Sequence, residues 1–364
     1  MKIHEVIDFL ERLVPLSSQE SYDNGGLIVG NRNEQLTGTL ICLDCTPEIV
    51  QEAIDTNCNL IIAHHPIVFK GLKKLTGSNY VEETVISCIK NNIALYAIHT
   101  SLDNYQYGVN RRIGEKLGLK NLRVLQPKKD VLCKLVIYTP KDKADELSSA
   151  LFAIGAGKIG NYEECQFEVE GRGTFKPMKD SNPTEGEIGV RSIVEEVKLE
   201  YLVSTHSLKG VLSEMKRVHP YEEVAHDIIP LLNENQFEGS GMYGELENPM
   251  NELEFLSFLK DNFNCGAIRH TKLFGKKIKS VAFCGGSGSF LLPAAKRVKA
   301  DVYVSADFKY HEFFDAEKDI VIADIGHYES EQFTVNLLAD ILNENFTNFA
   351  LHLTGINTNP INYF

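Results

Sequence analysis

The alternation of short apolar segments with amphipathic, helix-like segments is the feature that most constrains the fold of this chain. Toward the N-terminus, apolar segments of strand length occupy residues 38–45, 59–65 and 94–100. The same texture returns toward the C-terminus, at residues 280–286, 301–307 and 319–327. Short apolar strands that alternate with helices are typical of a mostly parallel sheet covered on both faces. We therefore predict an α/β domain built from both ends of the chain.

A different pattern separates these two parts, between residues 127 and 236. Its segments follow the order β-α-β-β-α-β, which is the split pattern of ferredoxin-like domains. We predict that residues 1–126 and 237–364 are the two parts of one discontinuous α/β domain with a mostly parallel sheet. A ferredoxin-like α+β domain at residues 127–236 would interrupt it. Three separate domains are the alternative arrangement.

Composition argues against several classes of function. The chain has 364 residues and a net charge of −13, without a block of Lys and Arg that could neutralise nucleic-acid phosphates, so sequence-independent nucleic-acid binding is disfavoured. No apolar run reaches the roughly 18 residues of a membrane span. The first helix-like segment carries charges throughout, unlike a signal peptide, so we expect a cytoplasmic protein. The eight scattered cysteines are expected to be free, buried thiols.

Polar side chains collect at the ends of the predicted strands. The carboxyl ends of strands in an open parallel sheet meet at one edge, and ligands bind there. The residues at these ends are Asp44, His64, His65, His99, Asp103, the glycine-rich stretch 285–288, Asp307, His327 and Glu331. His327 and Glu331 are four residues apart, so they share one face of a helix that begins there. We expect these residues to meet although they are distant in the sequence.

Five of these side chains suit metal binding, namely His64, His65, Asp103, His327 and Glu331. A typical catalytic zinc ion takes three protein ligands. Five ligands instead suit two ions that share a carboxylate and keep open positions for water. Imidazole and carboxylate together are compatible with Zn, Mn, Fe, Co or Ni. The simpler interpretation of any single histidine at a strand end is a hydrogen-bonded surface residue.

Further candidates surround this set. Backbone N–H groups of the turn formed by Gly285, Gly286, Ser287 and Gly288 are suited to cradle a phosphate at a helix N-terminus, and tight packing of the turn is the alternative explanation. Asp307, at the end of another predicted strand, is a second candidate for substrate binding. Asp23, beside two glycines, belongs either to a simple turn or to a pocket wall.

Several stretches resemble a known family, the type-2 GTP cyclohydrolase I or NIF-three-like proteins. They are "YDNGGLIVG", "IIAHHPIVF", "AIHTSLDN", "GSGSF", "SADFKYHE", "GHYESE" and "NTNP". The stretches "GAGKIGNYEECQFEVEGRGTFKP" and "HPYEEVAHDIIPL" are similar to the PII/CutA-like, trimerising insertion of long members. One departure is "SAD" at residues 305–307, where many relatives have Thr-Gly-Asp, which affects only the local turn geometry.

The resemblance implies a dinuclear metal centre in a toroidal homohexamer, with two divalent ions per chain. It assigns His65 and Asp103 to one ion, His64 and His327 to the other, and Glu331 to a bridge between them. It also implies a nucleotide substrate, GTP, whose guanine imidazole ring is opened by hydrolysis, with release of formate and formation of dihydroneopterin triphosphate. His99 would assist proton transfer. The same centre also suits phosphoester cleavage, or a non-enzymatic ring that binds metals and partners.

Overall fold

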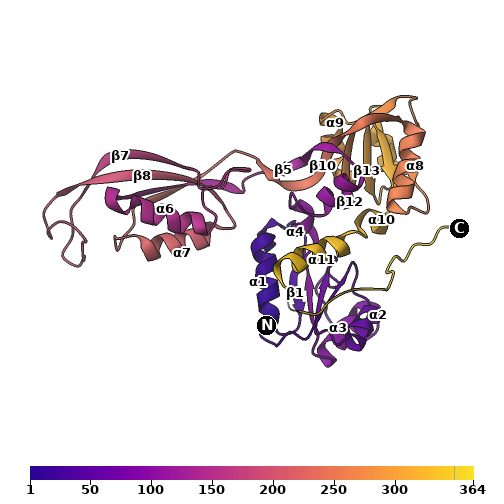
Figure 1. Cartoon of the computed structure of the whole chain (residues 1–364), viewed down its shortest axis with the longest axis horizontal. Helices are drawn as coiled ribbons and strands as arrows, with labels where there is room; N and C mark the ends of the chain where they lie inside the picture. The colour runs from indigo at the N-terminus through magenta and orange to yellow at the C-terminus, as the bar shows by residue number, and fades with distance from the viewer. Residues whose placement is uncertain (348) are drawn as a thin grey trace. The chain divides into compact units, whose positions relative to one another are not determined.

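The computed structural model describes residues 1–347 and 349–364 and divides into two compact units (Figure 1). One unit combines Met1–Gln126 with Phe237–Phe364, and the other is Pro127–Gln236. The division falls where the texture of the sequence changes. Among the described residues, no helix has the length and apolar character needed to cross a membrane.

The first sheet of the larger unit has five strands in the order β1-β4-β3-β2-β15. These strands are β1 (Gly26–Val29), β2 (Thr39–Cys42), β3 (Leu60–Ala63), β4 (Ala94–Ala97) and β15 (Leu351–Leu353). All neighbours are parallel except β1, which is antiparallel to β4. Successive side chains of a strand point to opposite faces, and accordingly Ile62 packs into one buried cluster and Ile61 into another. Both faces of this sheet are therefore covered.

Helices supply that cover. The helices that belong to this part of the unit are α1 (Ile3–Leu13), α2 (Pro47–Asp55), α3 (Tyr80–Lys90) and α11 (Thr334–Asn345). Residues of α2 and α3 pack with Ile61, whereas residues of α1 and α11 pack with Ile62. Pro47 opens α2 at a position where a missing backbone N–H has no cost. Asn79 caps α3 by accepting the Glu82 N–H.

The second sheet of this unit has six strands in the order β11-β14-β13-β12-β10-β5. They are β5 (Lys120–Lys128), β10 (Asn235–Asn251), β11 (Arg269–His270), β12 (Lys277–Ser287), β13 (Val302–Ala306) and β14 (Val321–Asp324). The strands β12, β13 and β14 are parallel, and β10 and β11 pair antiparallel at either side. The helices α8 (Glu252–Phe263) and α9 (Leu292–Arg297) belong to this half.

The expectation of one sheet with all strand ends at one edge is therefore wrong. The two long strands β5 and β10 complete a second sheet, and β10 escaped prediction because its sequence, "NQFEGSGMYGELENPMN", is rich in glycine and polar residues. One continuous apolar core nevertheless joins the two sheets. It includes Ile62 and Tyr96 from the first sheet and Phe283 and Val304 from the second. Because interiors are close-packed, this shared core fixes the two sets of strand ends relative to each other.

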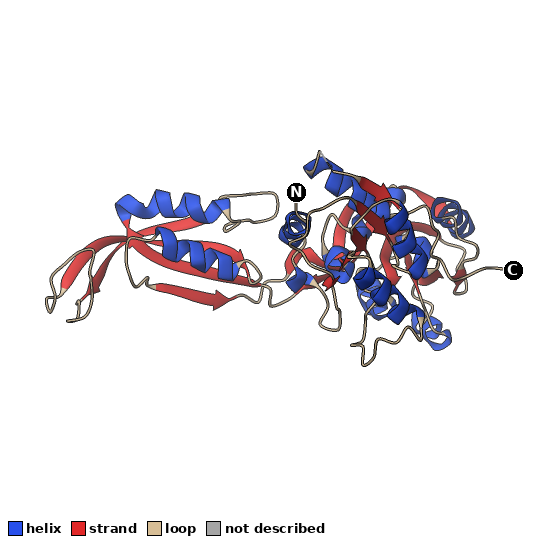
Figure 2. Ribbon diagram, turned by 90° about the horizontal axis from the view of Figure 1, so that it is seen from below, coloured by secondary structure: helices blue, strands red, loops and turns tan. Residues whose placement is uncertain are grey.

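The smaller unit has its own sheet and core (Figure 2). Its elements follow one another as β6 (Leu132–Pro140), α6 (Ala144–Ala153), β7 (Gln166–Phe175), β8 (Ser192–Ser204), α7 (Leu208–Val218) and β9 (His226–Pro230). The four strands lie in the order β7-β8-β6-β9, and all pairs are antiparallel. Leu151 of α6 and Val211 of α7 pack with strand residues such as Leu135 and Leu199. The unit thus has the element order that the sequence predicted.

Candidate metal centre

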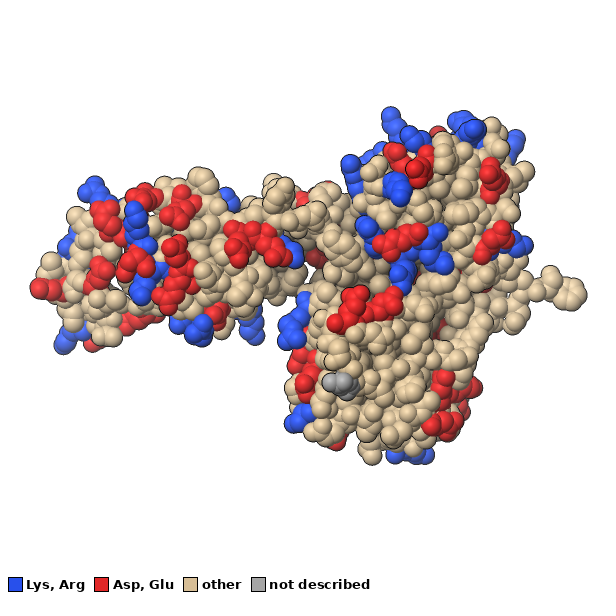
Figure 3. Space-filling model, viewed as in Figure 1, with Lys and Arg blue, Asp and Glu red and all other residues tan. Residues whose placement is uncertain are grey.

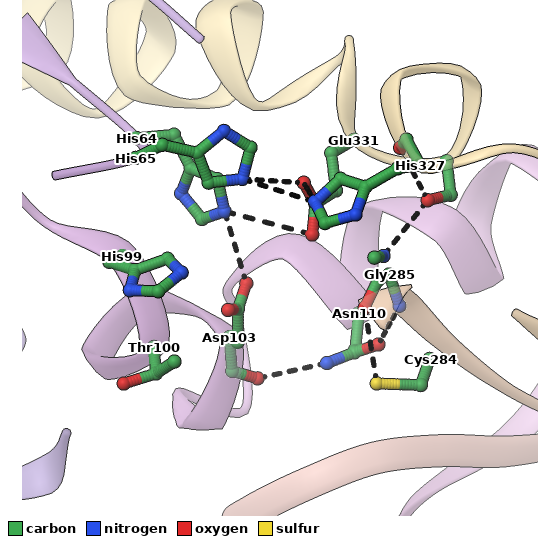
Figure 4. Close-up of polar contacts among 12 residues, drawn as sticks. His64, His65, His99, Thr100, Asp103, Asn110, Cys284, Gly285, His327 and Glu331 are labelled. Carbon is green, nitrogen blue, oxygen red and sulfur yellow. Dashed lines mark hydrogen bonds and ion pairs between the residues drawn. The ribbon is translucent and has the colours of Figure 1, made fainter. Parts of the chain in front are cut away.

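The structure brings the five predicted metal ligands together within the larger unit (Figure 4). His64 and His65 directly follow β3, and Asp103 lies on α4 (His99–Asn104), a short helix after β4. His327 and Glu331 are the two ends of α10 (His327–Glu331). The predicted helix does begin at His327, but it ends at Glu331 and is separate from α11. This break gives the first and last residues of α10 a common direction toward His64 and His65.

Glu331 is the centre of this cluster. Its Oε2 lies 3.0 Å from His65 Nε2 and 3.0 Å from His327 Nε2. Its Oε1 faces His64 Nε2 at 3.8 Å, which is too long for a hydrogen bond. His64 Nε2 is in turn 3.5 Å from Asp103 Oδ1. The distances therefore group His65 with His327 at one carboxylate oxygen, and His64 with Asp103 at the other. The assignment of ligands to the two ions that the family resemblance implies stays a prediction.

Two glycines of β12 give the Glu331 carboxylate its place. A Cβ atom at Gly286 would lie 2.3 Å from Glu331 Oε1 and 3.1 Å from His327 Nε2. Gly286 also has a φ of +60°, which side chains rarely tolerate. At Gly285 a Cβ atom would come within 3.3 Å of Glu331 Cγ. Glycine is thus required at both positions for the Glu331 side chain to lie this close to β12.

The predicted phosphate cradle at Gly285, Gly286, Ser287 and Gly288 is therefore wrong for its first two N–H groups. The Gly285 N–H donates to Asn110 Oδ1 at 3.0 Å, and the Gly286 N–H donates to Ser330 Oγ at 2.9 Å. The strand β12 runs on through Ser287, and the Gly288 carbonyl accepts the Tyr303 hydroxyl. Packing of the turn against the cluster, the alternative explanation, accounts for these contacts.

Carboxylates outside the ligand set hold two of the ligand imidazoles in place. His65 Nδ1 lies 2.8 Å from Asp44 Oδ1, and His327 Nδ1 lies 2.6 Å from Asp307 Oδ2. A carboxylate that accepts the Nδ1–H fixes the ring and leaves Nε2 for a metal. Asp307, predicted as a substrate contact, thus orients a histidine. The role of Asp44 escaped prediction, although its position at the end of β2, beside β3, was a usable signal.

Buried polar atoms without partners supply the test of whether a metal fits. His64 is completely buried, and neither of its ring nitrogens has a hydrogen-bond partner among the described residues. Asp103 Oδ1 is likewise buried and without a hydrogen bond. An unsatisfied buried polar group costs about 1–3 kcal/mol, and such groups are rare in native proteins. Divalent cations would satisfy His64 Nε2 and Asp103 Oδ1, so the residues present fit a metal centre.

Burial and the mutual contacts of the cluster shift the pKa values of its residues. Burial alone would lower the pKa of His65, but hydrogen bonds to Asp44 and Glu331 outweigh it and raise the pKa to about 10. Burial lowers the pKa of His64. Burial, together with the Glu331 charge, raises the pKa of Asp103 well above its usual range. A bound cation would therefore displace protons from His65 and Asp103, so binding is expected to strengthen as the pH rises.

Asn110 connects the two halves of the cluster, a role that the sequence did not reveal. Its side-chain amide donates to the Asp103 carbonyl at 3.0 Å, and its Oδ1 accepts the Gly285 N–H. Asp103 follows the first sheet, and Gly285 belongs to the second. Asn110 is only 1% exposed, so water does not compete for these hydrogen bonds. The residue therefore ties the position of one ligand to the strand that receives Glu331.

His99 lies beside the ligands rather than among them. Its ring centroid is 5.6 Å from that of His64 and 5.5 Å from that of His65. Its Nδ1 is 2.6 Å from Asp23 Oδ1, and Asp23 also accepts the Thr100 hydroxyl. Asp23 is thus a partner of the site rather than part of a simple turn. With Nδ1 occupied, His99 has Nε2 left for exchanging a proton with a bound molecule.

A pocket of about 330 Å³ adjoins the cluster. Its polar side is formed by Asp44, His65, His99, His327 and Asn359. Its apolar walls are Leu43, Pro66, Phe69, Tyr328, Pro360 and Ile361. This volume is at the small end of ligand-binding pockets, which span about 300–1,000 Å³.

Comparisons with known proteins agree over nearly the whole chain. The family model described as Duf34/NIF3 (NGG1p interacting factor 3) matches residues 1–360. A Staphylococcus epidermidis protein named "GTP cyclohydrolase 1 type 2 homolog" is 36% identical and aligns over 100% of both chains. A protein of the same name from Staphylococcus aureus is also 36% identical over 100% of both. A solved Bacillus cereus protein related to NIF3 has a TM-score of 0.88 at 35% identity, covering 100% of this chain and 99% of its own.

Proposed function

The chain belongs to the Duf34/NIF3 family, and from this premise we propose that it is a dinuclear metal-dependent hydrolase. The reaction class that we propose is that of type-2 GTP cyclohydrolase I, the name that relatives at 36% identity carry with the word "homolog". One observation supports it above all. Three histidines converge on Glu331, Asp103 lies beside His64, and buried atoms of His64 and Asp103 have no hydrogen-bond partner among the described residues.

The side chains around the centre have different proposed roles in the reaction. Two divalent ions, when bound, supply Lewis acidity and a water that is nucleophilic at neutral pH. Asp44 and Asp307 hold His65 and His327 in the ring orientation that ligation needs. His99, held by Asp23, is placed beside the pocket to give or take a proton as a carbon–nitrogen bond of a heterocycle is hydrolysed.

Two other functions use the same ligands and are decided by the same assay. A pair of divalent ions also suits in-line cleavage of a phosphoester. A metal-binding ring without catalysis is the other alternative. On the face seen in Figure 3, Lys and Arg side chains are interspersed with Asp and Glu, so this view offers no extended basic surface for a nucleic acid.

The test is an incubation of metal-replete protein with GTP. We predict release of formate and formation of a pteridine that fluoresces after oxidation. Asp103→Ala and Glu331→Ala should abolish both products, because each removes a ligand. Lys143→Ala is the matched control, since this lysine lies in the smaller unit with Glu146 as its partner. Release of phosphate without formate from a panel of phosphoesters would instead support the phosphoesterase. Inertness toward the whole panel would support a binding role.

We also propose a fold class and an assembly for the chain. The element and strand order of the smaller unit supports a ferredoxin-like, PII/CutA-like domain. The family resemblance supports a homohexamer in the cytoplasm. Light scattering of the full chain tests the assembly.

A further inference from the structure

The pocket beside the metal ligands is formed mainly by flat or apolar side chains. Phe69 forms one rim, in tilted contact with Tyr22 and edge-on to His99, each at 6.2 Å between ring centroids. Pro360, Ile361, Tyr328 and Leu43 also line the pocket. Aromatic and proline faces favour planar ring systems, which stack on them.

The wall made by the C-terminal segment is fixed at both sides of the pocket. The Thr358 hydroxyl donates to Asp44 Oδ2 at 2.9 Å, and Asp44 belongs to the first half of the site. The Asn359 amide donates to Glu329 Oε1 at 3.2 Å, and Glu329 lies on α10. Asn359 Oδ1 also accepts the Ile361 N–H at 3.1 Å. Pro360 and Ile361 are thus held in place before any ligand arrives, which lowers the cost of binding.

Charge disfavours a polyphosphate in this pocket. No Lys or Arg is among its lining residues, all of which belong to the described part of the chain. The ligands and their orienting partners include five carboxylates, from Asp23, Asp44, Asp103, Asp307 and Glu331. Two divalent ions would bring four positive charges, so the loaded site would keep about one negative charge. A phosphate chain would therefore gain no net electrostatic attraction in this pocket.

The lysines that come next in the sequence lie outside the pocket. Lys70, Lys73 and Lys74 follow Phe69 on an exposed loop, and none of them lines the cavity. Exposed lysines attract phosphates weakly at physiological salt because the charges are screened. Binding of a phosphate chain by these three lysines is therefore the alternative that the experiment must exclude.

From these observations we propose that the site binds its substrate through an uncharged, planar nitrogen heterocycle seated between Phe69 and the Pro360–Ile361 wall, and that it does not read a phosphate chain. This inference rests on the proposed function and names the substrate class for it. A nucleobase or nucleoside fits the class, whereas the triphosphate of GTP would contribute nothing to affinity.

The absence of tryptophan from the chain provides a direct measurement. Phe69→Trp places a single indole in the pocket wall, and Phe69 is already 47% exposed, so the core is undisturbed. The metal-replete variant is titrated with guanosine, GMP, GTP and ribose 5-phosphate, and the indole fluorescence is followed. We expect guanosine to quench it, GMP and GTP to bind within about threefold of guanosine, and ribose 5-phosphate to have no effect.

Second-site variants separate the two explanations. Ile361→Asp in the same background should weaken guanosine binding about tenfold or more, because it removes an apolar contact and the heterocycle would have to desolvate the new carboxylate. Ile361 is 51% exposed, so the fold should tolerate the change. Lys70→Ala, Lys73→Ala and Lys74→Ala combined should leave binding unchanged. The inference is overturned if GTP binds tenfold more tightly than guanosine and this gain disappears in the triple lysine variant. Absence of quenching by every heterocycle would overturn it as well.

The titration tests the recognition of heterocycles, and the formate assay tests the proposed reaction, so each proposal can be contradicted separately. Guanosine binding without formate release from any substrate contradicts the proposed reaction and leaves the recognition of heterocycles standing. Formate release from GTP alone, with GTP bound far more tightly than guanosine, supports the reaction and contradicts the inference.

Discussion

Glu331 organises the site because two glycines let its carboxylate approach β12, and because His65 and His327 converge on one of its oxygens. The sequence predicted five candidate ligands from the segments that follow strand ends, and the structure brings their side chains together. Their distances from one another could not be predicted, because these depend on side-chain directions at a seam between two sheets. The same holds for Asn110, whose two partners are distant in sequence.

Asn110 is expected to contribute both to stability and to metal affinity. Asn110→Ala removes two buried hydrogen bonds and leaves the Asp103 carbonyl and the Gly285 N–H unsatisfied. We expect the free energy of unfolding to fall by about 2–4 kcal/mol and metal affinity to fall about 10–100-fold. Denaturant unfolding of the metal-free protein and titration with Zn or Mn measure the two effects. Asn345→Ala, at an exposed helical asparagine, is the control. Unchanged metal affinity in Asn110→Ala would remove its positioning role.

At the scale of elements, the local sequence predicted most of the short, apolar strands. The strands β2, β3, β4, β13 and β14 are buried throughout, and their apolar runs marked them. Which sheet a strand joins is decided by distant partners, so two sheets were taken for one. The strand β15 shows this most clearly, since it pairs with β2 more than 300 residues earlier in the chain. Likewise, the glycine-rich turn has no local signal that tells a phosphate cradle from a packed ligand site.

The molecule as a whole is a larger unit interrupted by a smaller one. The chain leaves the larger unit from β5 and returns through β10, which are neighbours in the second sheet. A short linker could therefore join residues 126 and 237. All five ligands lie outside the excised segment.

Deletion of residues 127–236 consequently tests the independence of the units. We expect the shortened protein to stay folded and to bind metal with the stoichiometry of the full chain. Light scattering should show smaller assemblies, because the family resemblance assigns association to the insertion. A soluble deletion variant that binds no metal would contradict the division into independent units.

Elemental analysis of the purified chain tests the central claim most directly. Protein prepared without chelator should carry about two divalent ions per chain. Glu331→Gln should lose both ions, because both groups of ligands meet at this carboxylate. His64→Ala should keep the ion held by His65, and His311→Ala, at an exposed histidine, should keep both. A full chain that binds no ion after reconstitution with Zn, Mn, Fe, Co or Ni would contradict the dinuclear centre.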